Sequence, residues 1–462
     1  MLHHSQGRSY GLPFFMPKAG LNKQKARFKQ MVNKATIIHG DCLEELKKLD
    51  DCSVDAVVTD PPYGLSNTKP AQVADVLAAW VTGNTEAVPA KRGGFMGKDW
   101  DSFVPPPAVW AECLRVLKPG GHMAVFAGAR TQDLMGLSIR LAGFEIRDTL
   151  GWIYGSGFPK SMDVGKAIDK AAGAEREVVG YNPTSKGIKP GQSNYGGGGA
   201  EYQAGHNITA PATDAAKRWS GWGTALKPAI EPIILARKPL VGTVAGNVLA
   251  HGVGGLNIDA CRVAGAKPDT TRGASVNASS MAGPLGGQGR IIDDGKGRFP
   301  ANVLLDEHAA EEMDKQSGNV KGAVSNGHTG RTVSYHGNYG ALRQTPGYGD
   351  QGGASRFFPV FKYQSKAPKR ERPVIEREDG TKVQHPTVKP VALMEWLVEL
   401  ITPPNGVVLD PFAGSGTTLQ AATNKGFQPI GIEQDADYIE LIEKRLSSMN
   451  GTSAQECEPC LL

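Results

Sequence analysis

The pattern of apolar and polar positions is regular at both ends of the chain. Before residue 155, short apolar runs predict strands at 36–39, 54–59 and 122–126 and an extended segment at 144–154. Helical spacing of the apolar residues between them predicts helices at 42–49, 108–117 and 131–142. Pro119-Gly120-Gly121 predicts a turn ahead of the strand at 122–126. Strands that alternate with helices indicate an α/β fold around a mostly parallel sheet.

Strands and helices also alternate towards the C-terminal end. The pattern is weak between the two ends of the chain. After residue 377, the pattern predicts helices at 390–401, 416–425 and 436–449 and strands at 406–409 and 429–432. Between 155 and 361, candidate elements remain only at 164–172, 230–236 and 303–313. Of the 59 glycines, 33 lie between Gly180 and Gly353, which predicts long loops there. Such loops are usually functional or disordered.

Composition and charge bear on partners and compartment. The chain has 462 residues, and 51 Lys and Arg against 46 Asp and Glu give a net charge of +5. Residues 1–40 carry seven basic residues and no acidic one, which fits either a phosphate-seeking arm or a solvated tail. No run of about 18 uncharged apolar residues occurs, so we expect a cytoplasmic protein without a membrane span.

The cysteines do not indicate a metal site. The chain has six of them, and only Cys457 and Cys460 form a C-x-x-C pair. A four-ligand zinc site would need a second pair, so we expect free thiols and no metal.

Two motifs carry the candidate chemistry, and the first is a glycine turn after an apolar strand. The stretch 407–418 (VVLDPFAGSGTT) runs from that strand through Gly414 and Gly416 into a helix, which lets backbone approach a ligand closely. Glu433 ends the next strand at the spacing of a carboxylate that binds ribose hydroxyls. Leu419 stands where a dinucleotide fingerprint needs its third glycine. A nucleoside-bearing cofactor is therefore expected, and an NAD-dependent dehydrogenase is disfavoured.

The second motif is the tetrapeptide Asp60-Pro61-Pro62-Tyr63 at the end of the strand at 54–59. Open α/β sheets bind ligands at this end of their strands. The Asp60 carboxylate and the Pro61 carbonyl are two acceptors on a stiff segment, with the Tyr63 ring beside them. This combination suits a planar group with an exocyclic amine, although the tetrapeptide by itself is better explained as a proline turn in which Asp is a cap and Tyr packs.

The two motifs together resemble the amino-group DNA methyltransferases that use S-adenosylmethionine. Finding residues 60–63 (DPPY) ahead of 410–418 (DPFAGSGTT) resembles the beta order of motifs in that family. The segments 97–101 (GKDWD) and 155–160 (GSGFPK) further resemble bacteriophage and prophage members. The resemblance covers 36–160 and 357–446, about half of the chain. It implies a Rossmann-like methyltransferase sheet in circularly permuted order, with an inserted glycine-rich target recognition region.

The resemblance also assigns roles to residues. Glu433 would hold the ribose of S-adenosylmethionine and Asp41 its adenine, while Thr387 and Lys389 would be polar contacts in a segment that closes over the methionine part. The expected cofactor residues are Asp41, Cys42, Thr387, Lys389, Asp410, Phe412, Ala413, Gly414, Ser415, Gly416 and Glu433. Trp152 and Phe158 would form a wall of the base pocket, although Trp152 is equally explained as sheet core.

The expected reaction is methyl transfer to a base that has left the duplex, because its amino group is inaccessible within the stack. The catalytic residues would be Asp60, Pro61, Pro62 and Tyr63. Asp at the first position resembles the adenine-N6 enzymes, and some cytosine-N4 enzymes share it. Adenine is therefore favoured, with cytosine-N4 transfer or a catalytically inactive DNA-binding regulator as alternatives; the intact tetrapeptide argues against the regulator.

The chain is expected to divide into six parts. These are a basic arm (1–34), a catalytic half (35–154), a loop-rich target recognition region (155–361), a basic linker (362–384), a cofactor-binding half (385–449) and a flexible tail (450–462). Nine arginines between 218 and 356 suit contacts to bases and phosphates of double-stranded DNA. We expect a stand-alone, phage-type modification enzyme, and the sequence leaves open whether two chains pair as a homodimer.

Overall fold

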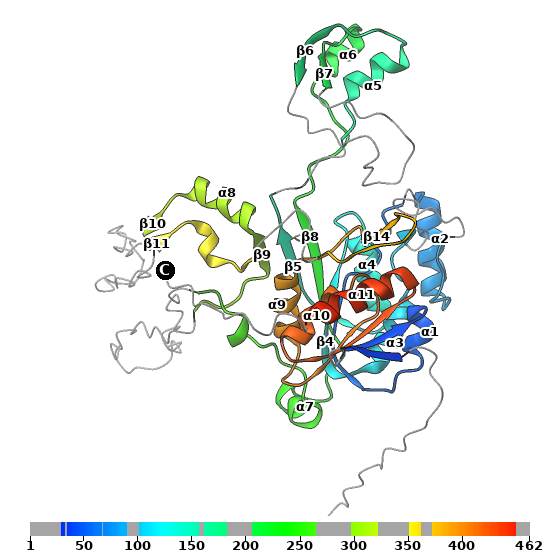
Figure 1. Ribbon diagram of the computed structural model, residues 1–462, viewed down its shortest axis with the longest axis vertical. Coiled ribbons are helices and arrows are strands. Elements are labelled where there is room, and N and C mark those ends of the chain that lie inside the picture. Colours follow the sequence, from blue (N-terminus) through cyan, green and yellow to red (C-terminus); the bar gives the residue numbers. More distant parts are fainter. Residues whose placement is uncertain are drawn as a thin grey trace, which may run out of the picture.

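The computed structural model describes residues 29–32, 35–66, 68–89, 101–155, 157, 161–182, 206–264, 297–321, 351–361 and 372–449. Its body is a ten-stranded sheet with helices on both faces (Figure 1). From one edge to the other the strands are β1 (Lys29–Val32), β2 (Ala35–His39), β16 (Gln428–Glu433), β15 (Val407–Asp410), β3 (Val54–Thr59), β4 (Leu117–Phe126), β8 (Ile230–Arg237), β5 (Glu145–Ile153), β9 (Val303–Asp306) and β12 (Val360–Phe361).

The two ends of the chain are interleaved in this sheet. β15 and β16 lie between β2 and β3, and β2, β16, β15, β3 and β4 are all parallel. β8 is antiparallel to both of its neighbours, β4 and β5. The predicted α/β fold with a mostly parallel, permuted sheet is therefore confirmed.

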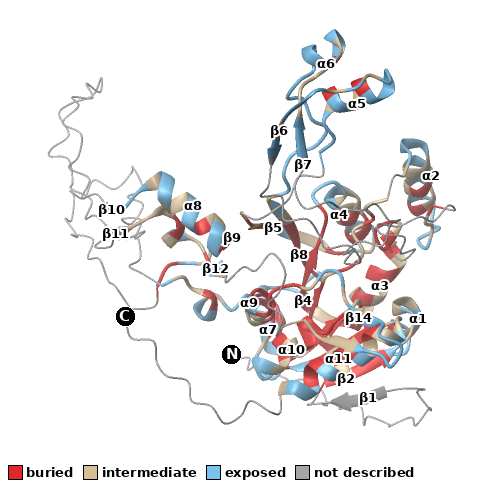
Figure 2. Cartoon of the chain, turned by 45° about the horizontal axis from the view of Figure 1, so that its top comes forward, coloured by how far each residue is buried: buried red, intermediate tan, exposed pale blue. Residues whose placement is uncertain are grey.

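Helices bury both faces of the sheet. One core is shared by α1 (Cys42–Leu46), α2 (Pro70–Val81), α3 (Pro107–Val116) and α4 (Gln132–Leu141). The other lies under α9 (Val391–Ile401) and α10 (Thr417–Asn424), with α11 (Ala436–Ser448) packed beside β2. Alternate residues of β3 enter the two cores, Val57 the first and Ala56 and Val58 the second. All six residues of β3 are buried, as expected of a central parallel strand. Figure 2 shows buried residues concentrated in the centre of the sheet.

Three predicted boundaries differ from the structure. The predicted turn at Pro119–Gly121 is wrong, because this segment is a bulge inside β4, and Gly120 provides the positive φ of 80°. The helix predicted at 42–49 ends at Leu46. The candidate element at 303–313 divides into β9 and α8 (Glu307–Ser317), because Asp306 caps the helix by accepting a hydrogen bond from the Ala309 amide.

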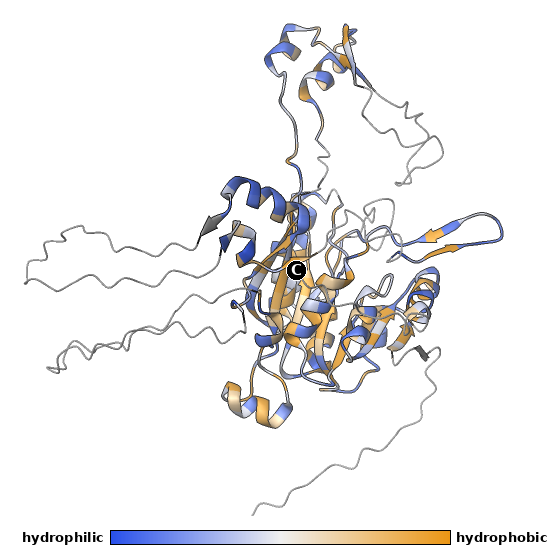
Figure 3. Ribbon diagram, turned by 60° about the vertical axis from the view of Figure 1, so that its left-hand side comes forward, coloured by the Kyte–Doolittle hydropathy of each residue, from blue (hydrophilic) through white to orange (hydrophobic). Residues whose placement is uncertain are grey.

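The region 155–361 contributes to the body as well as to its periphery. β8, β9 and β12 all come from it and pair in the large sheet. A lobe stands away from the body at the top of Figure 1. It consists of α5 (Val164–Ala171), β6 (Val178–Asn182), β7 (His206–Thr209) and α6 (Asp214–Arg218). Figure 3 shows the central sheet as mostly hydrophobic, whereas the lobe carries both hydrophobic and hydrophilic stretches.

The remaining elements are short. They are α7 (Val244–His251), the 3-10 helices η3 (Asp259–Cys261) and η4 (Ala354–Phe357), the pair β10 (Val320–Lys321) and β11 (Gln351–Gly352), and the hairpin of β13 (Val374–Glu376) and β14 (Lys382–Gln384). Within the described residues, no helix is long and apolar enough to cross a membrane. Almost all of the basic arm, residues 362–371 of the basic linker, the tail and Phe158 lie outside the described residues.

Candidate active site

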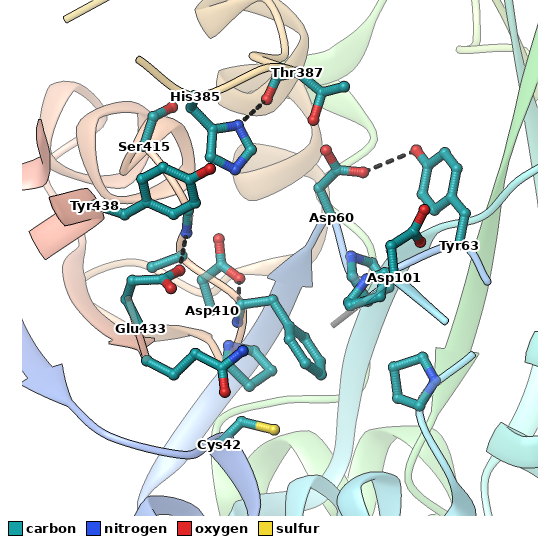
Figure 4. Close-up of a pocket in the computed structure, with 18 of the residues that line it drawn as sticks. Cys42, Asp60, Tyr63, Asp101, His385, Thr387, Asp410, Ser415, Glu433 and Tyr438 are labelled. Atoms are coloured by element: carbon teal, nitrogen blue, oxygen red, sulfur yellow. Dashed lines mark hydrogen bonds between the residues drawn. The ribbon is translucent and has the colours of Figure 1, made fainter. Parts of the chain in front are cut away.

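A cavity of about 860 Å³ opens where the parallel strands end, and both ends of the chain line it (Figure 4). Asp410 is the last residue of β15, Glu433 the last of β16, and Asp60 directly follows β3. Gly40 and Asp41 follow β2 in the same way. Because parallel strands present their carboxyl ends at one edge of a sheet, residues more than 300 positions apart meet here.

The segment from Asp60 to Tyr63 forms one side of the cavity. The Tyr63 hydroxyl lies 2.8 Å from Asp60 Oδ1 and 3.1 Å from Glu231 Oε2, and both oxygens are acceptors for it. Burial, together with these two carboxylates, raises the pKa of Tyr63 well above its usual value, so the hydroxyl keeps its proton. The Thr131 hydroxyl donates to the Tyr63 carbonyl at 2.6 Å, which anchors the backbone of the segment.

Lys389 reaches into the same group from the other half of the chain. Its ammonium donates to Asp60 Oδ2 at 2.7 Å and to the Tyr63 hydroxyl at 3.1 Å, and it lies 3.3 Å from Glu231 Oε2. Burial lowers the pKa of Lys389, but Asp60 and Glu231 outweigh burial and raise it to about 12. From the sequence, Lys389 is expected to contact the cofactor. In the structure, its ammonium instead contacts the carboxylates of Asp60 and Glu231.

The glycine turn forms the opposite side of the cavity. Gly414 and Gly416 have positive φ angles of 52° and 78°, and Gly416 is the N-cap of α10. The Glu433 carboxylate accepts hydrogen bonds from the Gly414 amide at 2.7 Å and the Asp435 amide at 2.9 Å. Burial raises the pKa of Glu433 to about 7 in spite of these bonds.

Asp410 lies between the two sides. Its Oδ1 accepts hydrogen bonds from the Thr59 hydroxyl at 2.6 Å and from the Phe412 amide at 3.0 Å. Burial raises the pKa of Asp410 to about 6. Asp410 thus joins the end of β3 to the glycine turn and fixes the spacing between the two motifs.

Asp41 and Cys42 border the cavity at the start of α1. Asp41 is the N-cap of this helix, and its Oδ1 accepts from the amides of Leu43 and Glu44 at 2.9 and 3.2 Å. Burial, followed by the charge of Asp41, raises the pKa of the Cys42 thiol to about 12. Cys42 therefore presents a neutral thiol.

The segment from His385 to Lys389 covers the glycine turn. The His385 ring packs against Tyr438 with 4.7 Å between the ring centroids. A Cβ atom on Gly414 would lie only 2.9 Å from His385 Nε2, so the ring rests directly on the turn. Burial lowers the pKa of His385 to about 4, and the imidazole is neutral.

Trp152 forms part of the cavity wall beside the tetrapeptide. It is 4% exposed, packs against Tyr154 with 5.5 Å between the rings, and belongs to the sheet core as well as the lining. In the antiparallel pair β5 and β8 it stands directly opposite Glu231. Both side chains therefore project from the same face of the sheet.

The remaining expected cofactor residues also lie in this cavity. Thr387, Phe412, Ala413 and Ser415 line it, whereas Gly416 shapes it through the turn. Sequence reasoning missed Glu231, His385, Asp101 and Tyr438, which line it too. A charged residue beside Pro232 within the apolar run 230–236 was the available signal for Glu231.

The family comparison agrees with this geometry. The model of the N6/N4 methylase family, described as DNA methylase, matches residues 54–218 and 307–444, about two thirds of the chain. The chain belongs to this family. Its members are amino-group DNA methyltransferases, and their methyl donor is S-adenosylmethionine.

Individual relatives within the family differ in how far they match. The type II methyltransferase M.HindIII of Haemophilus influenzae is 22% identical over 429 residues, covering 89% of this chain and 94% of that protein. M.HinfI, also of H. influenzae, is 46% identical over 72 residues, which are 16% of this chain and 20% of M.HinfI. YubD of Escherichia coli K12 is 45% identical over 71 residues, 15% of this chain and 31% of YubD. The chain thus spans less than a third of these last two proteins.

Solved structures of methyltransferases also align with the chain. M1.HpyAVI in complex with S-adenosylmethionine is 15% identical, with a TM-score of 0.33 and coverage of 88% of this chain and 98% of that one. The cytosine-N4-specific PvuII DNA methyltransferase is 14% identical, with a TM-score of 0.37 and coverage of 90% and 91%.

The cavity of this amino-group methylase fits the cofactor of its family. S-adenosylmethionine carries a sulfonium and an ammonium. The buried carboxylate of Asp410 and the partly buried carboxylate of Glu433 are in the lining and suit positive charge and hydroxyl donors. The backbone at Gly414 leaves no room for a side chain beneath His385. A volume of about 860 Å³ is within the range of small-molecule sites.

Proposed function

We propose that this methylase transfers the methyl group of S-adenosylmethionine to the exocyclic N6 of adenine in double-stranded DNA. The observation that carries the proposal is that the Asp60 carboxylate and the glycine turn open into one cavity. Asp410 links them through Thr59 on one side and the Phe412 amide on the other. An amine held by Asp60 and a cofactor held by the turn are thereby neighbours.

The base-binding side consists of Asp60, Pro61, Tyr63 and Trp152. The Asp60 carboxylate and the Pro61 carbonyl accept the two N–H bonds of the amine, which draws the nitrogen lone pair out of conjugation and orients it. The rings of Tyr63 and Trp152 offer apolar surface to a base that has left the duplex. Unstacking costs a few kcal/mol, and stacking on an aromatic ring is worth about 1–3 kcal/mol per base.

The cofactor side consists of the glycine turn, Glu433 and Asp41, with the segment of Thr387 above them. Glu433 accepts hydrogen bonds from the ribose hydroxyls, and Asp41 accepts from the adenine amino group. Phe412, at the turn, packs against the methionine part. S-adenosylmethionine supplies the activated methyl group, while these residues hold it in line with the amine, so that positioning and electrostatics lower the barrier.

In this proposal, the region 155–361 recognises the DNA sequence. The lobe of α5, α6, β6 and β7 stands clear of the sheet and can extend along a duplex. It carries Lys166, Lys170, Lys217 and Arg218 on its two helices, which suit phosphate contacts. The six-part division of the chain, the phage-type origin and the cytoplasmic location stay predictions from the sequence.

Cytosine-N4 transfer is the second candidate, because the acceptor pair at Asp60 and Pro61 suits either exocyclic amine. To decide between them, the protein is expressed in cells whose own DNA carries no methylated bases, and the DNA is then sequenced by a method that detects methylated bases. We expect N6-methyladenine within one short recognition sequence. N4-methylcytosine would contradict adenine specificity, and unmodified DNA would favour the inactive regulator.

A further inference from the structure

Two carboxylates in the cavity share the same two donors. The Lys389 ammonium lies 2.7 Å from Asp60 and 3.3 Å from Glu231. The Tyr63 hydroxyl lies 2.8 Å from Asp60 and 3.1 Å from Glu231. Each donor therefore has Asp60 as the nearer acceptor and Glu231 as a second one within reach.

The Tyr63 hydroxyl cannot serve both carboxylates at once. A tyrosine hydroxyl has a single hydrogen, so at any moment it donates to Asp60 or to Glu231. Lys389 has three N–H bonds, but on the Asp60 side it occupies an oxygen that an incoming amine also needs. Both oxygens of Asp60 already accept a hydrogen bond, one from Lys389 and one from Tyr63, so an incoming amine must share an oxygen with one of these donors.

We propose that Glu231 is the acceptor that takes over the Lys389 ammonium and the Tyr63 hydroxyl when the target amine reaches Asp60. Glu231 thus acts as a positioning residue for Asp60. The inference rests on the proposed function, in which Asp60 binds the amine. The exchange needs little movement, because the ammonium only has to close a 3.3 Å separation to hydrogen-bonding length.

The strand pairing holds Glu231 in the place that this role requires. It lies on β8 directly opposite Trp152 of β5, and so it points to the face on which the cavity opens. Its side chain is 24% exposed, against 9% for Lys389. The strand pairing therefore fixes Glu231 near the wall where the base is expected. From there its carboxylate can accept a hydrogen bond from the buried Lys389 ammonium.

Charge balance supports the same role. Asp60, Glu231 and the Lys389 ammonium together carry one negative charge, which suits an amine that becomes more positive during methyl transfer. Without Glu231 the remaining pair is neutral, and Lys389 has Asp60 as its only carboxylate partner in the group. Vacating Asp60 would then leave a buried ammonium without a carboxylate, which is costly.

The test compares Glu231→Gln with wild type on unmethylated DNA made by amplification, with labelled S-adenosylmethionine. We expect kcat to fall about ten- to a hundredfold, the range for hydrogen bonds to charged groups. The KM for DNA and the Kd for S-adenosylmethionine should stay near wild type, because contacts outside this group set them.

A double variant distinguishes this role from a structural one. Glu231→Gln combined with Lys389→Met has the same net charge in the group as wild type and no ammonium on Asp60. We expect the double variant to transfer methyl groups faster than Glu231→Gln alone. Glu145→Gln is the matched control, because Glu145 lies on the same strand pair in an ion pair with Arg237, 2.6 Å away, and outside the cavity lining.

The outcomes distinguish a failure of the role proposed for Glu231 from a failure of the proposed function. A wild-type kcat in Glu231→Gln, or a double variant no faster than the single one, would overturn the role of Glu231 while leaving an active wild type. A similar fall in Glu145→Gln would also overturn it, since any loss of charge on these strands would then suffice. No transfer by the wild type would overturn the proposed function and this inference with it.

Discussion

The raised pKa of Glu433 predicts a pH dependence for cofactor binding. Burial holds this pKa near 7, although the amides of Gly414 and Asp435 donate to the carboxylate. In the proposed site, the ribose hydroxyls donate to Glu433, and a carboxylate accepts them better than a protonated carboxyl group. Binding of S-adenosylmethionine should therefore weaken as the pH falls through 7.

The magnitude follows from the fraction of Glu433 that is charged. With a pKa of about 7, about a tenth of the side chains carry a charge at pH 6 and about nine tenths at pH 8. The affinity should consequently rise about tenfold over this interval, which corresponds to about 1.4 kcal/mol of binding free energy. Above pH 8 the contribution of Glu433 levels off, because its carboxylate is then fully charged.

Isothermal titration calorimetry from pH 6 to pH 8 measures this change directly. Glu433→Gln is the control, since it keeps the shape of the side chain and cannot titrate. S-adenosylmethionine has titrating groups of its own, and the variant reports their contribution. We expect the tenfold rise in wild type beyond any change seen in Glu433→Gln. Parallel pH profiles in the two proteins would refute the assignment of Glu433 to the ribose.

Further variants probe the other parts of the site. Asp60→Ala should abolish methyl transfer while the Kd for S-adenosylmethionine stays within a few-fold of wild type; loss of both would make Asp60 structural. Gly414→Ala should weaken cofactor binding in calorimetry, because its Cβ would lie 2.9 Å from an imidazole nitrogen. Gly426→Ala is the control: Gly426 also has a left-handed φ, of 80°, but a Cβ there would meet open space. It should lower the stability of the protein without changing cofactor binding. Thr59→Val removes the hydroxyl 2.6 Å from buried Asp410 and should lower the free energy of unfolding by about 1–3 kcal/mol in urea denaturation; an unchanged midpoint would contradict this.

Much of the sheet could be predicted because its strands are apolar runs with clear ends. The strand at 54–59 ends where two prolines follow, and the structure ends β3 at Thr59. Local pattern could not reveal that Pro119–Gly121 continues β4 as a bulge, because that depends on pairing with β3. Nor could it show that β8 would enter the sheet between β4 and β5, which is a matter of tertiary contact.

The lining of the cavity was predictable where a motif carried it and not where a single side chain did. The motifs at Asp60 and Gly414 placed both sides of the cavity, and Asp410 was among the expected residues. The link from Lys389 to Asp60 joins residues 329 positions apart, and no spacing rule connects them. Glu231 lay in the region expected to read DNA, so its place beside the tetrapeptide emerges only from the pairing of β8 with β5.

The identity of the methylated base tests the central claim most directly. The purified protein is incubated with labelled S-adenosylmethionine and amplified, unmethylated double-stranded DNA, and the DNA is then digested to nucleosides and analysed by mass spectrometry. The account predicts labelled N6-methyldeoxyadenosine from wild type and none from Asp60→Ala. Labelled DNA from Asp60→Ala would contradict it. So would a wild type that labels a nucleoside other than deoxyadenosine, or no nucleoside.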